Sequence, residues 1–263
     1  MDVIEALDQA WGSIRQLFRS LDAEEWDAPT ACSEWSVRDM AAHLGAVEGG
    51  FLGFDQPSPP EGWTTPHTGV DAWTAQGVAA RREWSTDQLV DEVDRVAETR
   101  LAQVHGLDEV GWQERVMGPL GETSIRGLCE IRLFDIYVHL LDMRFGLQRP
   151  LAFDAEPEAL EACVERAVQL SPWGAVKRAH VEDGTRIRLD LGGPATTVAD
   201  ISVAGGRAAL TAPEGDADEV VQGSAPAYLL LVSGRDELIG DDDGICAFGP
   251  AATALFDHYR FFS

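Results

Sequence analysis

One segment, residues 123–146, combines the period of a helix with polar side chains on one face. Its apolar residues recur at helical spacing, and we expect the helix to begin at the capping hydroxyl of Thr123 and to end at Gly146. Asp135 and His139 are four residues apart, so at about 100° per residue their side chains lie one above the other, about 40° apart around the axis. A carboxylate and an imidazole stacked in this way can bind one divalent ion. Further ligands for such an ion have to come from other parts of the chain, so this helix constrains how they pack.

Arg132 and Asp142 fall on the same side of this helix, within about 60° of the Asp135 and His139 pair. Such a stripe can be an exposed polar face, or it can point into a helical bundle. Apolar neighbours surround the stripe and favour the second interpretation. These neighbours are Phe134, Tyr137, Val138 and Leu140.

A chain of 263 residues with 45% hydrophobic content can build two cores, and we expect two domains, 1–150 and 151–263, of the α+β class. In the first domain two irregular connections, the proline-rich stretch 54–70 and the stretch 106–121, separate segments with helical periodicity. Helices are predicted at 2–20, 36–51, 71–84, 85–101 and 123–146. Helices joined by such long connections are typical of a four-helix bundle with crossovers.

After Pro150 the pattern changes to that of a small α+β domain. Alternating apolar and polar residues indicate hairpin-connected strands with one solvated face. We predict helices at 156–179, 225–232 and 251–259, and strands at 185–191, 198–203 and 207–211. The acidic run Asp241–Asp243 lacks the downstream glutamate of a calcium loop, so we expect a solvated turn.

Charge and composition exclude several classes of function. The formal net charge is −25, with one lysine, Lys177, so nucleic acid and anionic membrane surfaces are not expected partners. The chain has no run of about twenty apolar residues, and its amphipathic N-terminal segment carries acids, unlike a secretory signal, so we expect a cytoplasmic protein. The four cysteines have no CxxC pairing, which predicts reduced thiols rather than disulfides or a cysteine zinc site.

Two motifs carry a resemblance to a known family. The segment CSEWSVRDMAAHL, residues 32–44, is followed about ninety residues later by RLFDIYVHLLDMR, residues 132–144. Together they resemble the mycothiol-dependent maleylpyruvate isomerase family, which belongs to the DinB-like group of metal-binding four-helix bundles. The resemblance extends over the whole chain, because many members add a C-terminal α+β domain similar to sterol carrier proteins. The segment YLLLVSGR, residues 228–235, looks like the final motif of that domain.

The resemblance implies a divalent metal, usually zinc, held by a histidine of the second helix and by an acid and a histidine of the last. These positions fall on His43, Asp135 and His139. Taken alone, a histidine on an apolar helix face, such as His43, is more often a core residue than a ligand. The isomerases that give the family its name carry glutamate where this chain has Asp135.

Three nitrogen and oxygen ligands leave one coordination position open, as in catalytic zinc sites. A low-molecular-weight thiol bound there, mycothiol by resemblance, would lose its proton at neutral pH and become the nucleophile. Asp142 and Arg132 are candidates for orienting ligands or neutralising charge, and surface charges are the alternative. Arg235 is predicted to contact a carboxylate of the thiol or the substrate, with a solvated pair to Asp236 or Glu237 as its alternative.

Three hypotheses for function follow. The first is a metal-dependent, mycothiol-using transferase or cis–trans isomerase that acts on a small electrophilic substrate. The second is a metal-dependent hydrolase with a water in the open position, although the chain has no separate general base such as the glutamate of HExxH. The third is a non-catalytic small-molecule binding protein with a structural metal, which the three-ligand set disfavours. A monomer and a homodimer are both compatible with the sequence.

Overall fold

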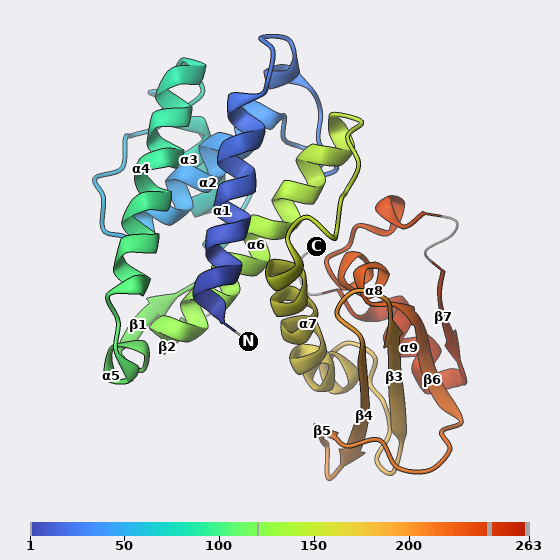
Figure 1. Ribbon diagram of the computed structural model, residues 1–263. Coiled ribbons are helices and arrows are strands. Elements are labelled where there is room, and N and C mark those ends of the chain that lie inside the picture. The colour runs from blue at the N-terminus through green and yellow to red at the C-terminus, as the bar shows by residue number, and fades with distance from the viewer. Residues whose placement is uncertain (1, 120, 241–243, 261–263) are drawn as a thin grey trace. The chain divides into compact units, whose positions relative to one another are not determined.

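The computed structural model describes residues 2–119, 121–240 and 244–260, and Asp241–Asp243 lie outside the described residues. The chain divides into two compact units (Figure 1), Asp2–Leu151 and a second unit that begins at Ala152. Each unit has its own elements and its own core.

The first unit is a helical bundle in which four long helices pack against one another. Helix α1 contacts α4 and α6, and α2 contacts the same two helices, so their buried faces close one core. A shorter helix, α3, packs on the outside of α2. The bounds are α1 Val3–Arg19, α2 Val37–Phe51, α3 Gly69–Ala79, α4 Thr86–His105 and α6 Ile125–Gly146. The predicted four-helix bundle is confirmed.

The helix starts follow the capping residues. The Ser36 hydroxyl accepts a hydrogen bond from the Asp39 N–H, and the Asp39 carboxylate accepts one from the Ser36 N–H, so a complete capping box opens α2. The predicted cap of α6 was wrong by one residue. Thr123 is extended and pairs with Val116 in a hairpin, so the Ser124 hydroxyl accepts the bond from the Gly127 N–H instead.

The stretch 106–121, predicted to be irregular, contains regular structure. A one-turn helix, α5 (Glu109–Trp112), is followed by the antiparallel pair β1 (Arg115–Gly118) and β2 (Gly121–Ser124). Strand β2 leads directly into α6. The hairpin therefore fixes where the long helix begins.

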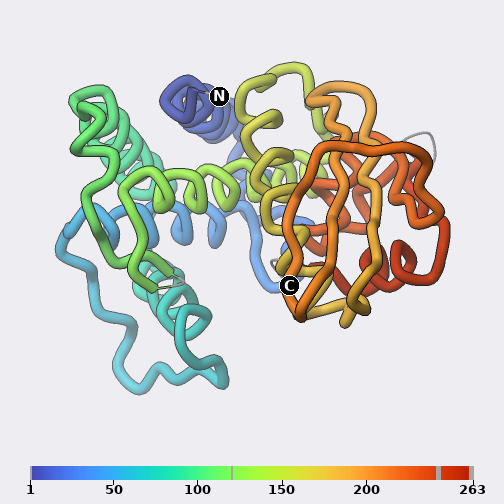
Figure 2. The backbone as a smooth tube through the Cα atoms, turned by 90° about the horizontal axis from the view of Figure 1, so that it is seen from below, coloured from blue at the N-terminus to red at the C-terminus, as the bar shows by residue number. Residues whose placement is uncertain are grey.

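The second unit is a five-stranded sheet with helices. The strand order is β5-β4-β3-β6-β7, in which β3 and β6 are parallel and the other neighbours are antiparallel. Figure 2 shows these strands side by side. Helix α7 packs on β4 and β5, while α9 packs on β6 and β7. The bounds are α7 Pro157–Lys177, β3 Arg186–Gly192, β4 Thr197–Ala204, β5 Arg207–Thr211, β6 Glu219–Ser224, α8 Ala225–Val232, β7 Ile245–Phe248 and α9 Pro250–His258.

Strand β3 shows why this unit could be recognised from its pattern. Ile187, Leu189 and Leu191 are fully buried and alternate with Arg188 and Asp190, which are partly exposed. The predicted α+β class is confirmed, although β6 and β7 were not predicted. Two 3₁₀ turns, Glu25–Asp27 and Asp236–Leu238, complete the described elements. Among the described residues, no helix is long and apolar enough to cross a membrane.

Candidate metal centre

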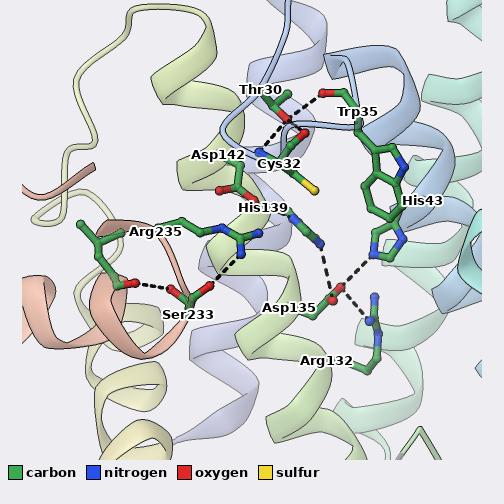
Figure 3. Close-up of polar contacts among 11 residues, drawn as sticks. Thr30, Cys32, Trp35, His43, Arg132, Asp135, His139, Asp142, Ser233 and Arg235 are labelled. Atoms are coloured by element: carbon green, nitrogen blue, oxygen red, sulfur yellow. Dashed lines mark hydrogen bonds and ion pairs between the residues drawn. The ribbon is translucent and has the colours of Figure 1, made fainter. Parts of the chain in front are cut away.

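The first unit brings together the three residues that the sequence analysis singled out as metal ligands. His43 comes from α2, and Asp135 and His139 come from α6 (Figure 3). Each offers one ligand atom, and these atoms all lie within 4.8 Å of one another. His43 Nε2 is 3.3 Å from Asp135 Oδ2, and His139 Nε2 is 3.6 Å from Asp135 Oδ1.

These separations fit a shared ion. Donor atoms placed tetrahedrally at about 2.1 Å from a zinc ion lie about 3.4 Å from one another. The two distances lie on either side of that value, and each ends on a different oxygen of Asp135. Two imidazoles and one carboxylate also match the nitrogen and oxygen ligands of catalytic zinc sites.

His43 is held as a neutral imidazole. Its burial lowers its pKa to about 4, although the nearby carboxylate of Asp135 acts in the opposite direction. The ring therefore keeps a free lone pair at neutral pH, which a metal ligand requires. The Trp35 ring lies 4.6 Å from the His43 ring, and the His139 ring meets His43 edge-on at 4.9 Å.

Asp135 is held as a carboxylate. Burial alone would raise its pKa, but the positive charge of Arg132 holds the pKa well below its usual value. Arg132 Nη1 donates to Asp135 Oδ2 at 2.8 Å, and Arg132 itself is only 4% exposed. The arginine therefore contacts the same oxygen that faces His43.

Asp142 contacts the other α6 ligand. Its Oδ2 lies 2.9 Å from His139 Nδ1, and the residue is completely buried. A carboxylate in this place accepts a hydrogen bond from Nδ1–H and so leaves the lone pair of His139 Nε2 free on the side of Asp135. Neither Asp142 nor Arg132 is a surface charge, so the exposed-face alternative for this stripe is wrong.

Two buried charges behind Arg132 were not predicted from the sequence. Glu48 of α2 is completely buried and accepts hydrogen bonds from Arg132 Nε, at 3.0 Å, and from Arg100 Nε of α4. Burial alone would raise the Glu48 pKa, but the two arginines hold it below its usual value. The only sequence signal was a glutamate within the apolar run of α2. Its partners are 52 and 84 residues away along the chain, so that signal could not identify them.

The loop before α2 closes over the centre. The Thr30 hydroxyl donates to the Trp35 carbonyl at 2.8 Å, and the Ala31 N–H donates to the Asp142 backbone carbonyl at 3.3 Å. The loop is therefore attached to α6 beside His139, and it presents Trp35 to both histidine rings (Figure 3). Trp35 belongs to the motif of residues 32–44, but no role at the metal centre was predicted for it.

Two further expectations from the sequence concern Cys129 and Arg235. Cys129 is fully buried and its pKa is raised to about 12, chiefly by burial, so its thiol stays protonated. Arg235 belongs to the second unit, where its Nη1 donates to the Ser233 carbonyl at 2.7 Å. Asp236, considered as its partner, pairs with Arg260 at 2.9 Å. The functional role of Arg235 stays a prediction.

The chain is similar to known proteins in sequence and in fold. The model of the mycothiol maleylpyruvate isomerase N-terminal domain matches residues 7–144, a range that includes all three candidate ligands. No curated protein matched the chain. Crystal structures of the mycothiol-dependent maleylpyruvate isomerase and of a mutant of it are similar to the chain in fold, with 17% and 16% sequence identity and a TM-score of 0.58 each. Each match covers 94% of this chain and 93% of the other.

Proposed function

The chain belongs to the mycothiol maleylpyruvate isomerase family, and from this premise we propose that it is a metal-dependent enzyme that uses mycothiol. The metal ligands are His43, Asp135 and His139, and zinc is the metal that this set suits best. The substrate is a small electrophile with an activated double bond. The reaction is its cis–trans isomerisation or its conjugation to the thiol.

The observation that carries the proposal is the cluster itself. A neutral imidazole, an ionised carboxylate and a second imidazole converge within 4.8 Å in the core of a bundle. Three protein ligands leave a position for an exogenous group. A divalent metal held by these three ligands would lower the pKa of a thiol coordinated at that position and would so supply a thiolate at neutral pH.

The remaining residues prepare that site. Asp142 holds His139 in the tautomer that leaves Nε2 free, and Arg132 keeps Asp135 ionised. Cys129 is not the nucleophile, because its pKa of about 12 leaves almost no thiolate at neutral pH. We assign the reactive sulfur to the cosubstrate.

We assign to Arg235 the recognition of a carboxylate on the thiol or the substrate. Its guanidinium offers a planar fork of donors that matches a carboxylate. Arg235→Lys keeps the charge but loses the fork, so we expect the folded, metal-loaded variant to show a raised KM for thiol or substrate, or a lowered kcat. Unchanged kinetics in this variant would remove Arg235 from the site.

The experiment that tests the proposal combines metal analysis with thiol-dependent turnover. Purified protein should hold one equivalent of metal, and His43→Ala or His139→Ala should lose it. His105→Ala and His180→Ala are matched controls, since neither histidine belongs to the cluster. A His43→Ala protein that keeps a full equivalent with unchanged affinity would show that the site is wrongly assigned.

Turnover is then measured with maleylpyruvate and with a generic electrophile, each in the presence of mycothiol, glutathione or no thiol. Metal coordination activates any thiol, so the preference has to come from the walls of the site. We expect mycothiol to be preferred. Equal rates with glutathione and mycothiol would refute the cosubstrate assignment, and turnover without any thiol would favour metal-assisted hydrolysis.

A further inference from the structure

Four buried or half-buried charges of alternating sign run through the first unit and end at a candidate metal ligand. In order they are Arg100 of α4, Glu48 of α2, and Arg132 and Asp135 of α6. Arg100, Glu48 and Arg132 are 2%, 0% and 4% exposed. Burying three charges away from water is costly, and replacing them with apolar residues is often neutral or stabilising. Stability alone therefore does not account for this chain of charges.

Glu48 determines how the Arg132 guanidinium is oriented. Glu48 Oε2 accepts from Arg132 Nε at 3.0 Å, and Arg132 Nη1 donates to Asp135 Oδ2 at 2.8 Å. The guanidinium is planar, so fixing Nε also fixes the direction of the Nη1 bond. Its remaining nitrogen, Nη2, is buried without a hydrogen-bond partner among the described residues. Arg132 is thus held by two carboxylates, one on each side.

The orientation has a consequence for Asp135. Arg132 contacts Oδ2 with one nitrogen, while Oδ1 faces His139 Nε2 at 3.6 Å. Without Glu48, the guanidinium could rotate and bind both oxygens of Asp135 as a fork, which is its preferred geometry with a carboxylate. Both oxygens would then be engaged by the arginine. With Glu48 in place, Oδ1 stays free of the arginine.

We propose that Glu48, itself held by Arg100, is a positioning residue that keeps Arg132 on one oxygen of Asp135 and leaves the other oxygen for the metal. This inference rests on the proposed metal site. Loss of the Glu48 charge would also weaken metal binding, because it leaves an unbalanced guanidinium beside a divalent cation. Removing a group that orients a metal ligand typically lowers metal affinity about 10–100-fold.

The chain offers a matched control in a second buried pair, Arg81 and Glu92. Arg81 is 1% exposed, Glu92 is 6% exposed, and Arg81 Nη2 donates to Glu92 Oε1 at 2.7 Å. Arg81 Nε donates to the second oxygen of Glu92, and Nη1 and Nη2 also donate to the Gly77 carbonyl and the Gln56 side chain. Glu92→Gln and Glu48→Gln therefore remove the same chemical group from similar surroundings, but only Glu48 is joined to Asp135 through Arg132.

The test measures metal affinity by competition with a chelator, together with the visible absorption spectrum of the cobalt-substituted protein. We expect similar losses in melting temperature for Glu48→Gln and Glu92→Gln. Only Glu48→Gln should lower metal affinity about 10–100-fold and shift the cobalt bands. Equal affinity in wild type and Glu48→Gln, or equal losses in both variants, would overturn the inference.

Glu48→Gln leaves Arg100 and Arg132 to share a neutral partner and could fail to fold. The double variant Glu48→Met with Arg100→Met removes one charge of each sign and replaces the pair by apolar side chains, which folded proteins tolerate well. It also leaves Arg132 without its orienting carboxylate, so it should fold and still bind metal more weakly than wild type. Wild-type affinity in the double variant would overturn the inference. A wild-type protein without metal affinity would instead contradict the proposed function.

Discussion

Asp142→Asn changes one atom in the contact between Asp142 and His139. The amide has the shape of the carboxylate, so the substitution leaves no cavity in the buried space that Asp142 fills. It removes the charge that faces His139 Nδ1 at 2.9 Å. An amide can accept a hydrogen bond through its oxygen or donate one through its nitrogen, and the second orientation stabilises the tautomer with the proton on Nε2. That tautomer cannot bind a metal through Nε2.

The expected size of the effect follows from that single contact. Loss of a group that orients a histidine ligand lowers metal affinity about 10–100-fold, which corresponds to about 1.4–2.8 kcal/mol of binding free energy. The measurement is a competition titration of metal between the protein and a chromogenic chelator. Asp200→Asn is the control, because Asp200 is also completely buried and ionised but lies in the second unit.

Two results are expected together. Asp142→Asn has to fold and to bind metal more weakly, while Asp200→Asn has to keep the wild-type affinity. An Asp142→Asn protein with wild-type affinity would show that His139 does not depend on Asp142 for its tautomer. A loss of the same size in Asp200→Asn would show that the assay reports general destabilisation.

Three further predictions concern other parts of the chain. Gly146→Ala should lower the melting temperature, because a Cβ there would overlap the backbone oxygen of Pro29 in the loop before α2, and overpacking costs about 1–3 kcal/mol. Gly12→Ala, with nothing within 4 Å of the added Cβ, should be neutral or stabilising. Iodoacetamide on the folded protein should modify the exposed thiol of Cys246 in β7 but not Cys129, whose pKa is about 12. Mass mapping that finds Cys129 alkylated before unfolding would contradict this prediction. The hydrogen bond from Arg188 lowers the pKa of Asp200, so this carboxylate stabilises the second unit above the unfolded pKa of about 3.9 and the gain is lost as the pH falls through the lower, folded value. Melting curves of Asp200→Asn should consequently show a smaller loss of stability in acid than those of wild type.

Local patterns in the sequence were sufficient for the helices that carry the site. A capping box marks the start of α2, and the four-residue spacing of Asp135 and His139 places both on one face of α6. The apolar neighbours of the stripe correctly indicated that it points inward. His43 was different, because a single histidine on an apolar face carries no information about its partner 92 residues away.

What the sequence did not reveal depends on contacts between distant residues. Glu48 is an isolated acid in α2, and only the packing of α4 and α6 supplies its two arginines. Strands β6 and β7 also went unpredicted. Strand β6 pairs in parallel with β3, so no hairpin turn announces it, and β7 is four residues long. The hairpin before α6 was not predicted either, because its strands are also only four residues long. This error displaced the predicted cap of α6 by one residue.

Helix α6 carries two of the three candidate ligands and both residues that orient them, and it contacts α1 and α2 in the core. Amide hydrogens in such a helix exchange with deuterated solvent only when the bundle opens as a whole. Many active sites lie on loops, where local unfolding can change or abolish activity without unfolding the domain. In this protein two of the candidate ligands lie on a buried core helix, so we expect them to be protected as strongly as the core of the first unit. We expect fraying of the α6 ends to leave the candidate metal centre intact, and we expect the centre to be lost in the cooperative step that unfolds the first unit.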